Sequence, residues 1–355
     1  MTATTRDILR FLLRTILAGV VVLLPFIIWY AVADPFKVLK HYDEYYDDPA
    51  LYNARIGLNK GMVTVKTYQN NLQQGYSYNA FIFGSSLSCY YDANEWKNLI
   101  ISSDTVERTV SPYHFDSASE TPMSMARKVE YLQRDGTSID YALMILDPLI
   151  LGGKELDTPF AIDPVEFNPG LLHFIKYHYT FFRASSNADF LKNYIAAKIT
   201  GRGDNIGHNP IFEVQPIIHN RHINEESIPQ WDSLITVNPG RFYLDNPLVA
   251  PKLHATPGPT VITGERRSAF EKIAGIFNEL KTDYHIIISP NRRGVSLSPA
   301  DLQTLQSIFN PSRIHDFSTI LAPDLQVDTL LYDNTHYRPP FASKMMRAVY
   351  SKSQL

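Results

Sequence analysis

The sequence is poor in cysteine. Its 355 residues include one cysteine, Cys89, and this rules out an intramolecular disulfide framework. Cysteine usage therefore does not indicate the compartment in which the chain folds. We interpret Cys89 as a small buried hydrophobic residue.

The sequence also lacks an excess of charge of either sign. Its formal net charge is −3 at pH 7, so composition gives no reason to expect nucleic acid or another polyanion as a partner. Aromatic residues make up 12% of the chain, which suits carbohydrate or lipid contacts, although an ordinary large core is the favoured explanation. A chain of this length can bury such a core in one or two domains.

One apolar stretch is long and free of charge, residues 15–33. Its length is close to the roughly 20 residues with which a helix crosses a bilayer. Three arginines precede it: Arg6, Arg10 and Arg14. The positive-inside rule then predicts that residues 1–14 lie in the cytoplasm and that everything after Asp34 lies outside. We expect a single-pass protein of the cytoplasmic (inner) membrane with an extracytoplasmic, periplasmic C-terminal part.

A cleaved signal peptide is the alternative interpretation of this stretch. Ala31-Val32-Ala33 has the small-residue pattern of a cleavage site, although the apolar region is long for a signal peptide. Either interpretation places the bulk of the protein outside the cytoplasm. A buried core helix agrees less well with arginines on one side only.

A second stretch combines a strand with a reactive side chain. Ala80 to Phe83 is a short apolar run typical of a buried strand, and it ends at Gly84, where the backbone can turn sharply. Ser85 and Ser86 follow. We expect the hydroxyl of Ser86 at the carboxyl edge of the sheet, where open α/β sheets bind their ligands.

Near the other end of the chain, Asp333 and His336 are three residues apart in one predicted loop. A serine hydroxyl needs a neighbouring base to become a good nucleophile, and a carboxylate can hold that base in the correct tautomer. If the loop folds onto the end of the first strand, Ser86, His336 and Asp333 can act as nucleophile, base and orienting acid. Taken separately, each motif is also compatible with a helix cap or a local hydrogen bond.

Gly84-Ser85-Ser86-Leu87 and Asp333-Asn334-Thr335-His336 resemble the first and last sequence blocks of the SGNH (GDSL-like) hydrolase superfamily. The resemblance covers about residues 78–147 and 283–350. It implies a three-layer α/β/α, flavodoxin-like domain with a mainly parallel sheet, and it assigns the nucleophile to Ser86 and the acid and base to Asp333 and His336.

The chain departs from the superfamily pattern at the oxyanion hole. The loop Asp116 to Ser119 occupies the place of the second block but has no glycine, so the amide of Ala118 or Ser119 would replace it. The third block usually supplies an asparagine where this chain has Asp147. An ionised carboxylate cannot donate and repels a developing oxyanion. Gly84, Ser119, Asp147 and Asn291 are our candidates for oxyanion or substrate contacts.

The order of predicted elements fits that fold. We expect a connector at residues 34–78 and an α/β domain at 79–355, interrupted by a lid-like insertion at about 148–260. The sequence-based elements are strands at 80–83, 106–110, 141–146, 285–289 and 312–317, and helices at 94–99, 122–132, 171–182, 190–199, 265–281, 299–309 and 341–350.

Two further patterns have ordinary explanations. His219 and His222, with His208 and His254 nearby, lack an acidic or cysteine motif to complete a metal site, so we expect surface histidines, no metal and no cofactor. The aromatic helix at 171–182 is typical of a core element, with contact to a membrane or a partner as the alternative.

An N-terminal anchor before an SGNH-like domain resembles envelope proteins of D-alanyl transfer to teichoic acid and of exopolysaccharide O-acetylation. That resemblance implies transfer of an acyl group, with acetyl favoured, to a cell-envelope glycan through acyl-Ser86. It also implies a multispanning membrane-bound O-acyltransferase as partner. A membrane-tethered glycan esterase and a catalytically silent glycan-binding or scaffold module are the alternatives. The acyl group, the glycan and the oligomeric state are not readable from the sequence.

Overall fold

A computed structural model describes residues 3–46, 55–103, 109–200, 212–213, 217–252, 254–319 and 327–350. The chain divides into two compact units. Unit 1 comprises Met1–Leu58 and Ile175–Val214, and unit 2 comprises Asn59–Phe174 and Gln215–Leu355. The residues that carry the predicted chemistry, Ser86, Asp333 and His336, all belong to unit 2.

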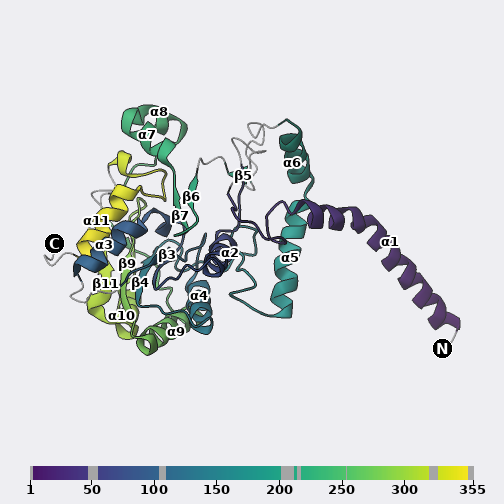
Figure 1. Cartoon of the computed structure of the whole chain (residues 1–355), viewed down its shortest axis with the longest axis horizontal. Coiled ribbons are helices and arrows are strands. Elements are labelled where there is room, and N and C mark those ends of the chain that lie inside the picture. Colours follow the sequence, from purple (N-terminus) through teal and green to yellow (C-terminus); the bar gives the residue numbers. More distant parts are fainter. Residues whose placement is uncertain are drawn as a thin grey trace. The chain divides into compact units, whose positions relative to one another are not determined.

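Unit 2 is built around a five-stranded sheet with the order β11-β9-β4-β2-β3 (Figure 1). Every neighbouring pair is parallel. The strands are β2 (Ala80–Gly84), β3 (Pro112–His114), β4 (Tyr141–Leu146), β9 (Asp283–Ile288) and β11 (Ile314–Asp316). The predicted α/β class with a mainly parallel central sheet is confirmed.

The central strands are apolar along their whole length because both faces of the sheet are covered. All five residues of β2 and all six of β4 are buried. Alternate side chains of β2 enter different cores: Phe81 and Phe83 point to one face, Ala80 and Ile82 to the other. A continuous apolar run is therefore the correct signal for these strands, rather than a polar–apolar alternation.

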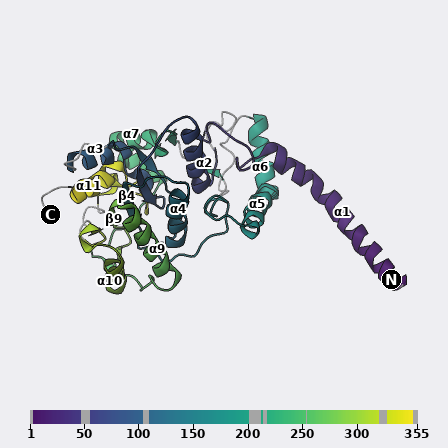
Figure 2. The ribbon, with the colours of Figure 1, turned by 60° about the horizontal axis from the view of Figure 1, so that its bottom comes forward.

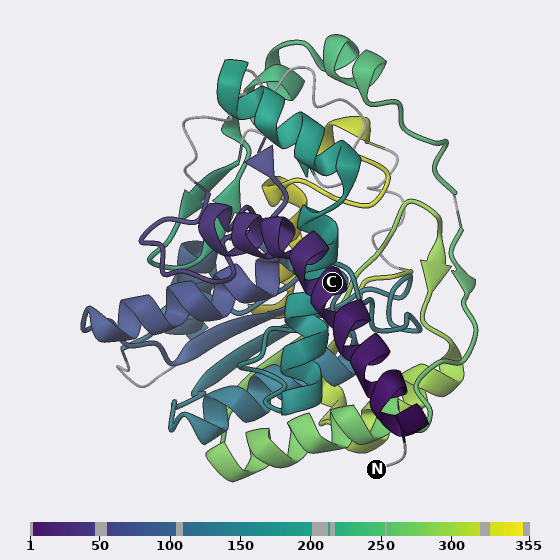
Figure 3. The same ribbon diagram turned by 90° about the vertical axis from the view of Figure 1, so that its right-hand side faces the viewer.

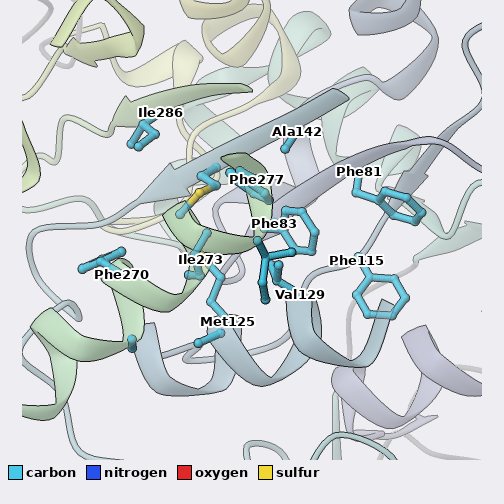
Figure 4. Close-up of a cluster of buried hydrophobic side chains, with 14 of the residues drawn as sticks. Phe81, Phe83, Phe115, Met125, Val129, Ala142, Phe270, Ile273, Phe277 and Ile286 are labelled. Atoms are coloured by element: carbon cyan, nitrogen blue, oxygen red, sulfur yellow. The ribbon is translucent and has the colours of Figure 1, made fainter. Parts of the chain in front are cut away.

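Helices pack on both faces. The first face carries α2 (Lys60–Gln73), α4 (Pro122–Arg134), α9 (Glu265–Leu280) and α10 (Pro299–Ile308). Helices α4 and α9 lie side by side (Figure 3). Figure 4 shows Met125 and Val129 of α4, with Phe270 and Ile273 of α9, in the same buried cluster as Phe83. The second face carries α3 (Ala93–Ser103) and α11 (Pro339–Tyr350).

Two helices begin with N-cap residues whose side chains accept hydrogen bonds from the first turn. The side chain of Thr121 accepts from the Ser124 N–H at the start of α4, and Ser298 accepts from the Asp301 N–H at the start of α10. In both helices proline occupies the first turn, where its missing N–H costs no hydrogen bond.

The second predicted strand is misplaced. We expected it at 106–110, but β3 is Pro112–His114 and residues 109–110 are not in a strand; residues 106–108 lie outside the described part. Val106 and Val110 favour a strand by propensity, whereas tertiary pairing with β2 selects the next residues instead. Pro112 is tolerated because β3 is at the edge of the sheet.

The predicted connector contains an unpredicted helix, α2, whose Val65 and Tyr68 are fully buried in the core of unit 2. The polar and β-branched residues of α2 obscure its helical periodicity in the sequence. The predicted lid holds β6 (Ile218–Asn220), β7 (Glu225–Ser227), α7 (Pro229–Val237), α8 (Pro239–Asp245) and β8 (Thr256–Pro257), the last paired with β10 (Val295–Ser296). Short 3-10 turns are η2 (Ser88–Tyr90), η3 (Pro311–Arg313) and η5 (Asp328–Leu330).

Unit 1 combines helix α1 (Ala3–Ala33) with α5 (Leu171–Ser185), of which Ile175 onward belongs to it, α6 (Ala188–Thr200) and the short pair β1 (Arg55–Ile56) and β5 (Phe212–Glu213). Within α1, Thr5–Ala33 contains an 18-residue window with a mean hydropathy of 2.5 and is long and apolar enough to cross a membrane. Figure 2 shows α5 and α6 at the C-terminal end of α1. The core of the unit is aromatic: Phe36 stacks on Phe190 and contacts Phe181.

Candidate functional site

The turn that follows β2 presents Ser86 at the carboxyl edge of the sheet. Gly84 pairs with Ile145 of β4, and a Cβ at Gly84 would lie 2.9 Å from the Ile145 carbonyl oxygen. The sharp turn therefore requires glycine. The Ser88 N–H and hydroxyl both bond to the Ser85 carbonyl. With Ser85 and Ser88 buried, Ser86 is the partly exposed serine of this turn.

Ser86, His336 and Asp333 form a continuous series of hydrogen bonds. The Ser86 Oγ lies 2.8 Å from His336 Nε2, and His336 Nδ1 lies 2.8 Å from Asp333 Oδ2. Both contacts are satisfied when Nδ1 carries the imidazole proton and donates to Asp333, while Nε2 accepts from the Ser86 hydroxyl. This is the geometry in which a histidine can take the proton of a serine nucleophile.

The loop geometry keeps Asp333 ionised. Its Oδ1 accepts from the backbone N–H groups of Thr335 and His336, each at 2.7 Å. Burial alone would raise the pKa of Asp333, but the hydrogen bond and charge of His336 and these two backbone donors outweigh burial and hold it below its usual value. A carboxylate in this state can stabilise an imidazolium beside it.

Helices α7 and α8 brace the loop that carries His336. Asp232 of α7 accepts from Arg338 Nε at 2.7 Å and from the Tyr332 hydroxyl at 2.8 Å. The Tyr243 hydroxyl of α8 donates to the Leu331 carbonyl at 2.7 Å. Part of the predicted lid therefore packs against the loop that carries His336.

A buried ion pair supports the turn that carries Ser86. Glu120 and Lys128 lie 2.7 Å apart with both side chains fully buried. Glu120 Oε2 accepts from the Gly84 N–H at 3.1 Å, and Lys128 Nζ donates to the Phe115 carbonyl at 3.1 Å. Burial raises the pKa of Glu120 to about 7, although the charge of Lys128 opposes the shift. The pair fixes the position at which β2 ends.

A second buried polar group holds the other side of the turn. Asp116 Oδ2 accepts from the Ser88 hydroxyl at 3.3 Å and from the Cys89 thiol at 3.0 Å. Lys60 lies 3.7 Å from Asp116 Oδ1 and 2.8 Å from Glu226. Burial, with the nearby charge of Asp116, raises the pKa of the Cys89 thiol well above its usual value. Cys89 is thus a buried thiol with a structural contact.

Asp147 lies beside the predicted nucleophile at the same sheet edge. Gly84 at the end of β2 pairs with Ile145 of β4. Ser86 lies two residues after Gly84, and Asp147 lies two residues after Ile145. Asp147 is 4% exposed, and its Oδ1 accepts from the Leu149 N–H at 2.9 Å. Burial raises its pKa, and the Leu149 N–H, His336 and Arg293 only partly offset that effect. Asp147, Glu120 and Ser85 line one small cavity.

The remaining oxyanion candidates differ in what they offer. Ser119 is exposed and has φ +52°, the left-handed conformation that favours glycine. Asn291 is used elsewhere, since its Nδ2 donates to the Val295 carbonyl and its Oδ1 accepts from the Val295 N–H. Gly84 contributes its N–H to Glu120.

No group of three or more histidine, cysteine, aspartate or glutamate side chains in the described ranges could hold a metal ion. His219 Nε2 lies 3.0 Å from Asn224 Oδ1, and His208 lies outside the described residues. Sequence analysis missed Glu120, Asp116 and Asp232, because single acidic residues in loops and helices carry no local pattern. Their roles depend on partners far away in the chain.

Comparison with known proteins does not assign a family. No protein-family model matches this sequence, and no curated protein matches it. The site must therefore be interpreted from its own geometry.

Proposed function

We propose that this chain is a membrane-anchored acyltransferase with a three-layer, SGNH-type domain, which moves an acyl group, with acetyl favoured, to a hydroxyl of a cell-envelope glycan. The observation that carries the proposal is the hydrogen-bonded series Ser86–His336–Asp333. Two motifs some 250 residues apart in the chain meet in the order of a serine nucleophile, its base and its acid. The resemblance to SGNH hydrolases, which rests on the same two motifs, supports the assignment of the superfamily.

The first half-reaction forms an ester on Ser86. His336 Nε2 takes the hydroxyl proton as Ser86 Oγ attacks the acyl carbonyl, and Asp333 stabilises the imidazolium. The tetrahedral intermediate then expels the donor's oxygen or sulfur, which receives the proton from His336. In the second half-reaction His336 deprotonates a glycan hydroxyl, which attacks acyl-Ser86 and releases the serine. Water in place of the glycan gives hydrolysis by the same steps.

Asp147 limits the rate of this chemistry when it is ionised. A carboxylate beside the developing oxyanion repels it, whereas backbone N–H groups in the turns after β2 and β3 attract it. The buried position of Asp147 favours its neutral form, which can donate a hydrogen bond. The acid in place of the superfamily's asparagine thus still permits an oxyanion donor.

The N-terminal helix sets the place of the reaction. With α1 across the cytoplasmic membrane and Arg6, Arg10 and Arg14 on the inner side, unit 2 faces the outside. The donor acyl group has to cross the bilayer, and the described chain has one candidate span. A multispanning O-acyltransferase is therefore the partner that this function needs.

The test uses the full chain in detergent or nanodiscs with p-nitrophenyl acetate, followed by intact mass. We expect an adduct of one acetyl group on the wild type and none on Ser86→Ala, with release of nitrophenol slowed by roughly 10³-fold or more in Ser86→Ala and His336→Ala. Added glycan acceptors then compete with water for the acetyl group, and a product that is always acetate identifies an esterase instead. A wild type without any adduct favours the silent glycan-binding module.

A further inference from the structure

Helices α5 and α6 each bury one face in unit 1 and leave an apolar face uncovered. Tyr177 and Phe181 of α5, and Phe190 and Tyr194 of α6, are buried in the aromatic core. Four apolar side chains of the same helices, which we call the α5–α6 face, are 48% to 79% exposed. They are Ile175, Tyr179, Ile195 and Ile199. In each helix the two residues are four positions apart, so they share one side.

This face belongs to helices that touch α1 inside its uncharged segment. Trp29 Nε1 donates to the Ser185 carbonyl at 3.2 Å, and the Trp29 ring meets Tyr194 edge-on at 5.2 Å. Tyr30 contacts His178 and Phe182. Trp29 is about 6 Å from the end of α1, at a rise of about 1.5 Å per residue. Figures 1 and 2 show α5 and α6 on either side of this end of α1.

The exit from α1 is short and fixed. The Asp34 carboxylate accepts from the N–H groups of Val38, Leu39 and Lys40. Phe36 stacks on Phe190 of α6, with ring centroids 5.1 Å apart and planes 16° apart. A tight turn therefore follows the apolar helix directly, and Phe36 in this turn packs against α6. Tryptophan and tyrosine at this point are typical of a membrane–water interface.

The charge of the two helices suits a lipid surface. Lys176, Arg183, Lys192 and Lys198 are exposed, against one exposed acidic residue, Asp189. Helices that lie in the headgroup layer combine an apolar side with lysine and arginine on the polar side, because the long basic side chains reach the phosphates. A helix that covers an ordinary soluble core has a polar outer face, whereas the outer faces of α5 and α6 carry exposed isoleucines.

We propose that the α5–α6 face lies in the headgroup layer of a lipid bilayer beside the end of α1, so that unit 1 sits on the membrane surface as well as being anchored in it. This inference rests on the proposed insertion of α1. The occupant is lipid, because the same helices contact α1 at the depth where a span of residues 15–33 leaves the acyl chains.

The experiment measures the depth of single fluorophores in the full chain in nanodiscs, with lipids that carry a quencher near the headgroup or near the acyl-chain end. Labels are placed at Ile175→Cys and Ile199→Cys. Cys89 is buried and its thiol is shielded. Leu24→Cys in α1 reports insertion of the span.

We expect the headgroup quencher to remove about half or more of the fluorescence at positions 175 and 199, as for side chains buried ~5–10 Å deep. Quenching at position 24 with none at 175 and 199 overturns the proposal, leaves the anchor standing, and assigns the face to a protein partner. Absence of quenching at position 24 overturns the anchor and this proposal together. Gel filtration and circular dichroism confirm that each variant is folded.

Discussion

At the scale of single residues, Asp333 has two measurable effects. Asp333→Asn keeps the shape of the side chain but favours the wrong tautomer of His336, because an amide nitrogen can donate to Nδ1. We expect the rate of acylation of Ser86 to fall by about 10³- to 10⁴-fold, with little change in substrate binding. Stopped-flow release of nitrophenol measures this rate. A fall of less than about tenfold would exclude Asp333 as the orienting acid.

The same variant should also change the pH dependence of stability. The folded-state pKa of Asp333 is below its unfolded value, so the unfolded chain binds more protons as the pH falls through this window. Asp333 therefore stabilises the fold above its unfolded pKa of about 3.9, and this stability is lost as the pH falls through the lower folded value. Urea unfolding of Asp333→Asn should show a smaller loss of stability on acidification than the wild type.

Asp147 is the residue at which substitution should improve the reaction. Asp147 can donate a hydrogen bond only while it is protonated, and it repels an oxyanion when it is ionised. Asp147→Asn supplies an N–H donor of nearly the same shape at every pH. One oxyanion donor is worth about 10²- to 10³-fold in rate in acyl transfer, so we expect at least a tenfold rise in the acylation rate. Asp147→Ala, which removes the charge but adds no donor, is the matched control. A slower Asp147→Asn enzyme would show that Asp147 takes part as an acid.

At the scale of elements, the support of the His336 loop by α7 and α8 makes a prediction. Asp232→Ala breaks the contacts of Asp232 with Arg338 and Tyr332. Hydrogen bonds to charged groups contribute about 1.5–3 kcal/mol. Without these contacts His336 should be less well aligned with Ser86, and acylation should slow by roughly 10- to 100-fold. Asp245→Ala on the same helix pair is the control, because Asp245 is exposed and pairs only at 3.5 Å with Arg241.

The discriminating measurement is the separation of kcat from KM. If Asp232 acts by positioning His336, kcat should fall while KM stays near that of the wild type, and Asp232→Asn, which keeps one acceptor oxygen, should recover part of the rate. Equal losses in Asp232→Ala and Asp245→Ala would contradict a positioning role for Asp232.

The pair Glu120–Lys128 links α4 to the end of β2. Glu120→Ala leaves the fully buried Lys128 without its carboxylate, which should cost about 3–5 kcal/mol of stability. The double variant Glu120→Gln with Lys128→Met removes both charges and should recover a large part of that loss, while the Gln oxygen can still accept from the Gly84 N–H. Urea unfolding of the three proteins provides the comparison. A double variant no more stable than Glu120→Ala would contradict the ion-pair explanation.

The raised pKa of Glu120, about 7, also makes the stability of the fold depend on pH. The folded state binds more protons than the unfolded state between the unfolded pKa of about 4.3 and this value. Ionisation of Glu120 therefore lowers stability as the pH rises through that window. The double variant, which has no carboxyl at position 120, should lose less stability than the wild type between pH 5 and pH 7.

At the scale of the whole molecule, the arginines before α1 predict its orientation. In intact cells a membrane-impermeant thiol reagent should label Leu244→Cys from outside and should label Thr5→Cys only after the membrane is opened. Arg6, Arg10 and Arg14 lie within the distance over which basic residues control orientation. Labelling of Thr5→Cys in intact cells would reverse the topology, and labelling of neither residue would indicate that the domain stays inside.

How much of the molecule the sequence reveals depends on how local each signal is. The strands at 80–84 and 141–146 and the capped helices at 122 and 299 are predictable because apolar runs and caps are local. Helix α2 and strand β3 are not, because tertiary pairing and burial select them over more typical neighbours. Ser86, Asp333 and His336 belong to two local motifs that can be recognised in the sequence. Glu120, Asp116 and Asp232 contact partners that only the folded chain brings near.

The distance along the chain between Ser86 and His336 has a consequence for biosynthesis. The two residues are 250 positions apart, and at about 5–20 residues per second the ribosome needs roughly 10 to 50 s to pass from one to the other. During that interval the emerging chain carries its serine hydroxyl without a base, and such a hydroxyl is a poor nucleophile. Under the proposed function, the half-made protein is therefore inert toward acyl donors, and reactivity begins only after translation has passed His336.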